Sequence, residues 1–173
     1  MERRLGHRKI IVLAEDLYEE LELWYPVLRL REEGAIVVIA GTGGKTYHGK
    51  HGYPVTVETT AEKLSHAGFD AVVIPGGYAP DRLRRHPAVM TLVREMFQQG
   101  KVIAAICHAA WIPISAGILK GRRVTCFPAV KDDVLNAGAE YVDAEVVRDG
   151  NVITSRYPDD LGAFCREIIK ALA

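Results

Sequence analysis

Short, uninterrupted apolar runs alternate with longer amphipathic stretches, and this alternation restricts the fold of the chain more than any other feature. The runs Lys9–Ala14, Asp70–Ile74 and Lys101–Ile106 are almost wholly apolar, as strands buried on both faces of a parallel sheet are. Patterns with helical spacing, Glu19–Glu33 and Ala88–Gln99, each stop at a glycine. Strands alternating with helices predict an α/β protein with a mostly parallel sheet and helices on both of its faces.

The other segments complete the predicted architecture as one domain over residues 1–173. Pro26 lies inside the first helical pattern, where it predicts a bend or a late first turn. The further expected elements are a strand at Ala35–Ala40, a small β excursion over residues 41–58, a helix at His108–Ala116, a strand at Val124–Phe127, a short helix at Lys131–Asn136, a hairpin over residues 144–155 and a closing helix from Pro158.

Composition excludes several classes of function. The formal net charge is zero, so nothing favours nucleic acid or an anionic membrane as a partner. The apolar runs are too short to span a bilayer, and the basic start reads as a tail leading into the first strand, not as a signal peptide. The three cysteines, Cys107, Cys126 and Cys165, are widely spaced and favour a reducing, cytoplasmic setting.

Three loops are expected to meet at one edge of the sheet, because ligands of such sheets bind beyond the carboxyl ends of the strands. These loops contain "EDLYEE" after Ala14, "PGGYAPD" after Ile74 and "CHAAW" after Ile106. The chemistry of the protein is expected there.

Cys107 sits where a strand turns into a helix, the position of the nucleophile in a strand–turn–helix elbow. Such a turn needs small neighbours two residues away on either side, and Ala105 and Ala109 meet this condition. The N-terminus of the helix starting at His108 is expected to lower the pKa of the thiol, and its N–H groups could hold an oxyanion. The alternative is that Cys107 is only a small buried hydrophobic residue.

The neighbouring polar residues each allow a structural and a functional interpretation. His108 is not expected to act as a base on the adjacent thiol, since adjacent residues at an elbow point in different directions; it could equally be a structural hydrogen-bonding residue. Gly76 and Gly77 could bring backbone N–H groups to a ligand or form a plain tight turn. Most of the acidic residues in the first loop and helix start are expected on a solvated face, with one aimed inward beside Cys107. These residues are Glu15, Asp16, Glu19, Glu20 and Glu22.

Taken together, "DAVVIPGGYAPDRLR", "GKVIAAICHAAW" and "SRYPDDL" resemble the PfpI-type branch of the ThiJ/PfpI superfamily of cysteine-dependent hydrolases, glyoxalases and deglycases. The resemblance covers nearly the whole chain and implies a flavodoxin-like three-layer sandwich. It implies that Cys107 is the nucleophile, that Glu19 is the inward carboxylate bonded to the sulfur, and that Gly77 and His108 supply oxyanion-hole N–H groups. It further implies that the imidazole of His108 meets Asp81 of a neighbouring subunit in a homo-oligomer (a dimer, trimer or hexamer).

The expected function is therefore that of a cysteine-nucleophile enzyme needing no metal or organic cofactor. Its substrate would be a peptide or amide, or an α-oxoaldehyde such as methylglyoxal or its protein adduct, with no nucleic acid or membrane partner. The alternative is a stress protein without turnover, in which Cys107 is a redox sensor or the chain is a holdase. The chain differs from the family at three places: it has Ala109-Ala110 for Gly-Pro, Asp81 for the usual Glu, and Phe127 for an aromatic hydroxyl.

Overall fold

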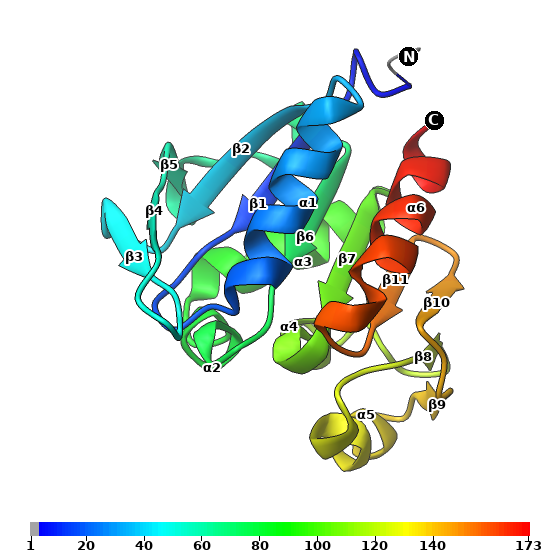
Figure 1. The fold of residues 1–173 in the computed structure, drawn as a ribbon. Helices are drawn as coiled ribbons and strands as arrows, with labels where there is room; N and C mark the ends of the chain where they lie inside the picture. Colours follow the sequence, from blue (N-terminus) through cyan, green and yellow to red (C-terminus); the bar gives the residue numbers. More distant parts are fainter. Residues whose placement is uncertain (1–3) are drawn as a thin grey trace.

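The computed structural model describes residues 4–173 and is built around a seven-stranded sheet with the order β10-β11-β7-β6-β1-β2-β5 (Figure 1). Only the β10–β11 pair is antiparallel, and every other neighbouring pair in this sheet is parallel. The predicted mostly parallel sheet is therefore confirmed. Its strands are β1 (Lys9–Leu13), β2 (Ile36–Gly41), β5 (Thr59–Thr60), β6 (Ala71–Ile74), β7 (Val102–Ile106), β10 (Val146–Asp149) and β11 (Val152–Ser155).

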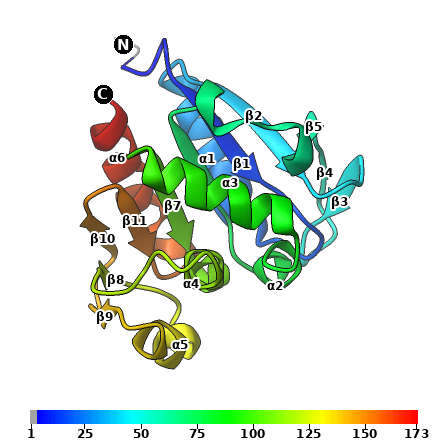
Figure 2. The ribbon, with the colours of Figure 1, turned by 180° about the vertical axis from the view of Figure 1, so that it is seen from behind.

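Helices cover both faces of this sheet, as a sheet buried on two sides requires. Helices α1 and α6 lie side by side on one face, and α3 lies on the other, where Figure 2 shows it in front of the strands. The three-layer sandwich expected from the sequence is thus present. The helices are α1 (Glu20–Glu32), α2 (Ala79–Leu83), α3 (Pro87–Gln98), α4 (Trp111–Ser115), α5 (Lys131–Asn136) and α6 (Leu161–Leu172).

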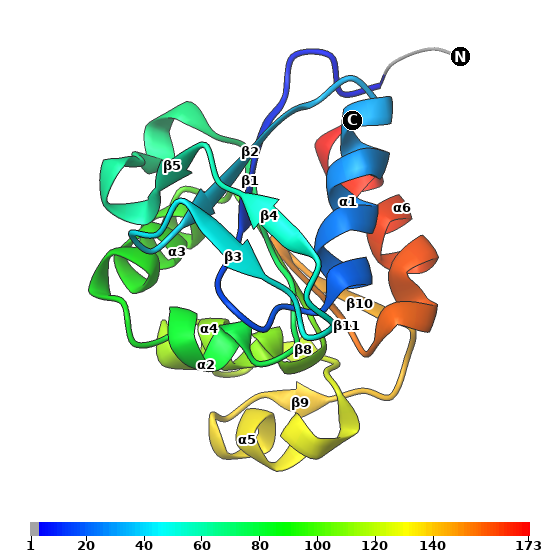
Figure 3. The same ribbon diagram turned by 60° about the vertical axis from the view of Figure 1, so that its left-hand side comes forward.

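Two small sheets stand apart from the main one. The excursion expected over residues 41–58 forms an antiparallel hairpin of β3 (Thr46–His48) and β4 (Pro54–Thr56), whose turn lies beside the start of α1 (Figure 3). Strands β8 (Arg123–Val124) and β9 (Glu140–Tyr141) form a short parallel pair.

Three expected elements differ in the structure. The strand expected at Val124–Phe127 ends at Val124, because the N–H of Thr125 donates to the side chain of Thr154 at 2.9 Å instead of continuing the strand pairing. The helix expected at His108–Ala116 is split into a 3-10 turn, Cys107–Ala110, and α4. The late first turn expected from Pro26 does not occur, since α1 begins at Glu20 and runs through the proline without interruption.

The core of the sandwich brings three strand ends together. Strands β1, β6 and β7 are neighbours in the sheet, and their residues are almost completely buried between the helical layers. Because the three strands are parallel, the loops after them emerge at the same edge. The predicted meeting of these loops at one edge of the sheet is confirmed, and the candidate site lies there.

Candidate active site

Cys107 occupies a strained elbow directly after β7. Its φ of +64° is a left-handed conformation that costs a residue with a Cβ about 1–3 kcal/mol. The buried Ala105 and Ala109 leave room for the tight turn, as the sequence predicts. The turn holds the thiol at the floor of a cavity, with 7% of the residue exposed. Backbone strain of this kind persists where the surrounding structure holds a group in a functional position.

Two backbone N–H groups lie near the sulfur. Those of His108 and Gly77 act to lower the pKa of the Cys107 thiol. Gly77 has a φ of +75°, and a Cβ on the adjacent Gly76 would lie 2.7 Å from the Cβ of Cys107. Glycine is therefore required at both positions, one for its conformation and one for close approach. That these two N–H groups form an oxyanion hole, the role expected for Gly77 and His108, stays a prediction.

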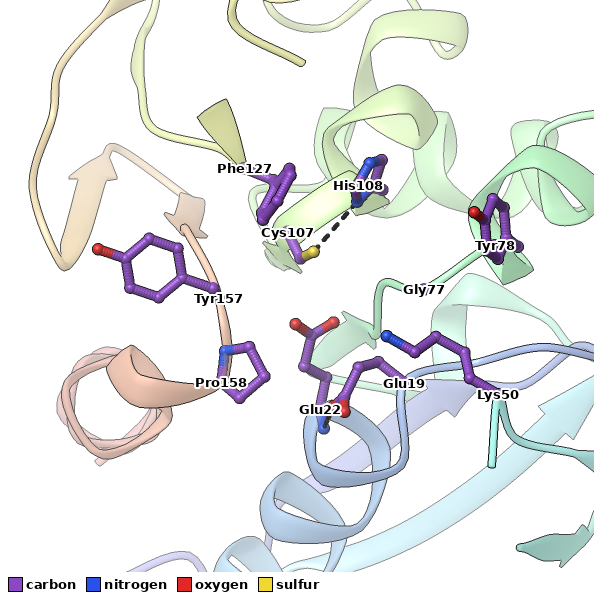
Figure 4. Close-up of a pocket in the computed structure, with 10 residues that line it drawn as sticks. All are labelled: Glu19, Glu22, Lys50, Gly77, Tyr78, Cys107, His108, Phe127, Tyr157 and Pro158. Atoms are coloured by element: carbon purple, nitrogen blue, oxygen red, sulfur yellow. Dashed lines mark hydrogen bonds between the residues drawn. The ribbon is translucent and has the colours of Figure 1, made fainter. Parts of the chain in front are cut away.

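The carboxyl group that faces the sulfur belongs to Glu22, and the expectation that Glu19 holds this place is wrong. Glu19 is the N-cap of α1, and its Oε2 accepts a hydrogen bond from the N–H of Glu22 at 2.9 Å. Its carboxylate is thereby turned back onto the helix, whereas Glu22 points from the first turn of α1 toward Cys107 (Figure 4). The buried face of α1 contains Glu22, Leu23, Pro26, Val27 and Leu30. A glutamate on this apolar stripe was the sequence signal that could have identified Glu22.

Glu22 holds its proton at neutral pH. Its side chain is completely buried, and burial together with the nearby charge of Glu19 raises its pKa to about 8. Oε2 accepts a hydrogen bond from the N–H of Gly76 at 2.7 Å, while Oε1 has no hydrogen-bond partner within residues 4–173. The proton therefore belongs on Oε1, since Oε2 is engaged as an acceptor. A carboxylic acid with one free, protonated oxygen thus stands beside the thiol.

The imidazole of His108 contacts the sulfur of its own neighbour, contrary to expectation. Nδ1 lies 3.2 Å from Sγ of Cys107. The left-handed turn at Cys107 folds the ring back over the thiol, where it stacks on Phe127 at 4.7 Å and meets the edge of Trp111 at 5.2 Å. Burial and the positive charge of Lys50 lower the pKa of His108, so the ring is mainly neutral at pH 7 and able to accept a proton.

The pKa of the thiol is shifted in the direction opposite to that expected. Burial raises the pKa of Cys107, and the charge of an ionised Glu22 raises it further, against the two backbone N–H donors, which lower it. The helix dipole invoked from the sequence is weak here, because the cysteine is followed only by a 3-10 turn and the short helix α4. While Glu22 holds its proton, its charge is absent, and burial alone raises the pKa of the thiol.

A cavity of about 220 Å³ opens over the sulfur (Figure 4). Phe127, Tyr157 and Pro158 form its apolar wall, and Lys50 and Tyr78 stand on the opposite side of Cys107. Lys50 and Tyr157 were missed from the sequence. Lys50 comes from the β3–β4 turn and Tyr157 precedes α6, so no shared motif links them to the elbow.

Asp81 lies near the elbow but is not among the residues that line this cavity. It belongs to α2, which packs against the 3-10 turn at Cys107, and its carboxylate pairs with Arg85, two residues after the end of that helix. Within residues 4–173, no group of three or more His, Cys, Asp or Glu side chains could hold a metal ion. No helix in the same part of the chain is long and apolar enough to cross a membrane.

Known proteins resemble this chain in both sequence and fold. Residues 8–171 match the model of the DJ-1/PfpI family. The chain is 49% identical to Deglycase PH1704 from Pyrococcus horikoshii over 95% of its own length and 99% of the relative's. It is 40% identical to Protein/nucleic acid deglycase 2 from Escherichia coli over 95% and 98% of the two chains.

Among solved structures, a two-domain protein from Anabaena variabilis with DJ-1/ThiJ/PfpI-like and ferritin-like domains superposes with a TM-score of 0.94 at 40% identity. That match covers 95% of this chain and 48% of the longer one. The fold and the cysteine at the elbow thus agree with the sequence match. The chain belongs to the DJ-1/PfpI family.

Proposed function

We propose that the protein is a cysteine-dependent enzyme that converts small α-oxoaldehydes, or their adducts on amino and thiol groups, into 2-hydroxy acids. The observation that carries this proposal is the buried carboxylic acid of Glu22, which is directed toward the nucleophile Cys107. Isomerising an α-oxoaldehyde requires one proton to move between adjacent carbons, which a carboxyl group with a pKa near 8 is suited to perform. The names of the deglycase relatives agree with this chemistry.

The contacts around the sulfur support the following reaction. His108 takes the thiol proton across the 3.2 Å contact, and Sγ bonds to the aldehyde carbon of the substrate. In an adduct, the amine or thiol first leaves this carbon with the hydroxyl proton, which re-forms the aldehyde. The N–H groups of Gly77 and His108 hold the resulting oxyanion, which takes the proton of Glu22. The carboxylate of Glu22 then removes the proton from the former aldehyde carbon and returns it to the neighbouring carbon, while the proton of the new hydroxyl group moves to the neighbouring oxygen, leaving a 2-hydroxyacyl thioester. Water cleaves this thioester: His108 returns its proton to the sulfur, and the proton of the released 2-hydroxy acid returns to Glu22.

Hydrolysis of small amides or peptides is a second candidate, and the paired N–H donors at the sulfur favour it. The test compares the turnover of methylglyoxal to lactate with that of a fluorogenic peptide amide, using wild type, Cys107→Ala and Glu22→Gln. Cys107→Ala is expected to abolish the main activity. Glu22→Gln is expected to lower kcat for methylglyoxal by about 10²–10⁴-fold, since the amide cannot move a proton.

Amide turnover with none of methylglyoxal would select the second candidate. If neither substrate is turned over while peroxide converts Cys107 stoichiometrically to a sulfenic or sulfinic acid, the chain is a redox sensor and the enzymatic proposal fails.

A shared active site in a homo-oligomer completes the proposal. Asp81 is on α2 beside the elbow and 45% of its side chain is exposed, so it is accessible to a second copy of the chain. We expect it to orient His108 of the partner subunit. Mixing inactive Cys107→Ala with inactive Asp81→Ala should restore part of the activity after subunit exchange. A monomer in sedimentation would contradict the shared site. The three free thiols favour a reducing, cytoplasmic setting.

A further inference from the structure

Lys50 is a positive charge at the cavity that the chemistry above does not use. It lines the cavity with Cys107, and Figure 4 shows its ammonium directed toward the space beside Glu19 and Gly77. Its charge acts on groups on two sides of the cavity, because it lowers the pKa of both Glu22 and His108. Lys50 is exposed to solvent, and its ammonium reaches the rim of the cavity, where it can meet a ligand.

The acidic residues around Lys50 are engaged elsewhere. Glu20 binds His51 through both carboxylate oxygens, at 2.6 Å to the backbone N–H and 3.0 Å to Nδ1. Glu19 accepts from the N–H of Glu22, and Glu22 holds its proton at neutral pH. Within the part of the chain that the structure describes, no carboxylate pairs with the ammonium of Lys50 in an ion pair of 4 Å or less.

The backbone on both sides of Lys50 is held in place. Its own N–H donates to the carbonyl of Tyr18 at 2.9 Å, and the N–H of Gly49 donates to the carbonyl of Tyr53 at 2.9 Å. Gly49 packs directly on the side chain of Glu20, where a Cβ would collide with the carboxylate. The turn is thus clamped to the start of α1, and the lysine is positioned over the cavity despite being on a hairpin.

The same clamp explains the remaining acidic residues of the first loop. Asp16 accepts from the N–H of His48 at 2.9 Å, and the buried Glu15 accepts from the hydroxyl of Thr42. The expectation that these residues form a solvated face is therefore wrong: they bind the segment around the hairpin. Their contacts hold in place the segment that carries Lys50.

The two sides of the cavity therefore differ in polarity. Phe127, Tyr157 and Pro158 form an apolar wall on one side of the sulfur, and the unpaired ammonium stands on the other. We propose that Lys50 is a specificity-determining residue that binds a carboxylate of the substrate, so that the preferred substrates are carbonyl compounds carrying a carboxylate close to the reacting carbonyl. Adducts of α-oxoaldehydes with amino acids belong to this class. This inference rests on the proposed function and narrows its substrate class.

Two alkylating agents of nearly equal shape test the charge preference without any turnover. Iodoacetate carries a carboxylate where iodoacetamide carries a neutral amide, and both alkylate Cys107. For each thiol, the rate of alkylation by iodoacetate is divided by the rate with iodoacetamide. This ratio is expected to be about tenfold higher for Cys107 than for the free thiol of N-acetylcysteine amide, which is the effect of one nearby, partly solvated positive charge. Lys50→Met should remove this excess and Lys50→Arg should retain most of it. Lys45→Met, directly before β3 and not among the residues that line the cavity, is the matched control and should leave the ratio unchanged.

A second measurement tests the substrate class itself. Lactate release is compared for the methylglyoxal hemithioacetals of N-acetylcysteine, which has a carboxylate, and of its amide. Wild type should favour the acid in kcat/KM by about tenfold, mainly through KM, and Lys50→Met should lose this preference.

The two measurements separate the two proposals. A rate ratio in wild type equal to that in Lys50→Met overturns the carboxylate site, even if methylglyoxal is turned over. A Lys50-dependent ratio without any turnover supports the carboxylate site while the proposed α-oxoaldehyde chemistry fails.

Discussion

Replacing Glu22 by glutamine tests the central electrostatic feature of the site. An unfolded chain ionises this glutamate near pH 4.5, whereas burial and the charge of Glu19 raise its pKa in the folded protein to about 8. Between these values the folded protein holds a proton that the unfolded chain has released. The stability of the wild type therefore falls as the pH rises through this window. At 1.36 kcal/mol per pKa unit, the loss is about 3 kcal/mol at pH 7 and approaches about 5 kcal/mol above pH 9.

Glutamine at this position has no charge to desolvate, and its oxygen can still accept from the N–H of Gly76. The quantity to compare is the free energy of unfolding of the wild type minus that of Glu22→Gln. This difference should fall by about 4 kcal/mol between pH 5 and pH 9. Denaturant titrations at both values, followed by the fluorescence of Trp24 and Trp111, measure this difference. Glu32→Gln, an exposed position on the same helix, is the control for losing a carboxyl group.

Glu22 and the thiol of Cys107 interact, so the same comparison in a Cys107→Ala background isolates the titration of the carboxyl group. A difference that changes by less than about 1 kcal/mol between the two pH values in that background would refute the reasoning. It would mean that Glu22 ionises in the folded protein much as it does in an unfolded chain.

Three further predictions concern the geometry around the sulfur. Gly76→Ala should lower the free energy of unfolding by about 2 kcal/mol or more in denaturant titrations, because the Cβ of the alanine would collide with Cys107 and Glu22. A change of less than about 0.5 kcal/mol would contradict this. Glu19→Ala should cost about 1 kcal/mol through loss of the helix cap, and Glu19→Gln should recover part of it, in the same assay. Iodoacetamide should label Cys107 in the native protein, whereas the buried Cys126 and Cys165 should react only after unfolding, as peptide mass mapping would show; equal labelling of all three would contradict the burial pattern.

The sequence by itself determined the fold class and the place of the site. Alternating apolar runs and amphipathic helices require a covered parallel sheet, and parallel neighbours bring their carboxyl ends to one edge. For that reason the pattern of the chain alone predicts that Cys107, His108 and Gly77, which closely follow β7 and β6, lie together. The topology of the sheet determines the position of residues that directly follow its strands.

The tertiary structure alone decided which side chains complete the site. Whether Glu19 or Glu22 faces the sulfur depends on where α1 begins and which of its faces is buried, and a shift of a few residues along a helix turns a side chain to the opposite face. Lys50 reaches the cavity only because its hairpin is clamped to α1 by contacts distant in sequence. The pKa values of Glu22 and Cys107 follow from burial and from the charges packed around them. Such shifts depend on the distances and dielectric surroundings of packed groups, which no local pattern in the sequence encodes.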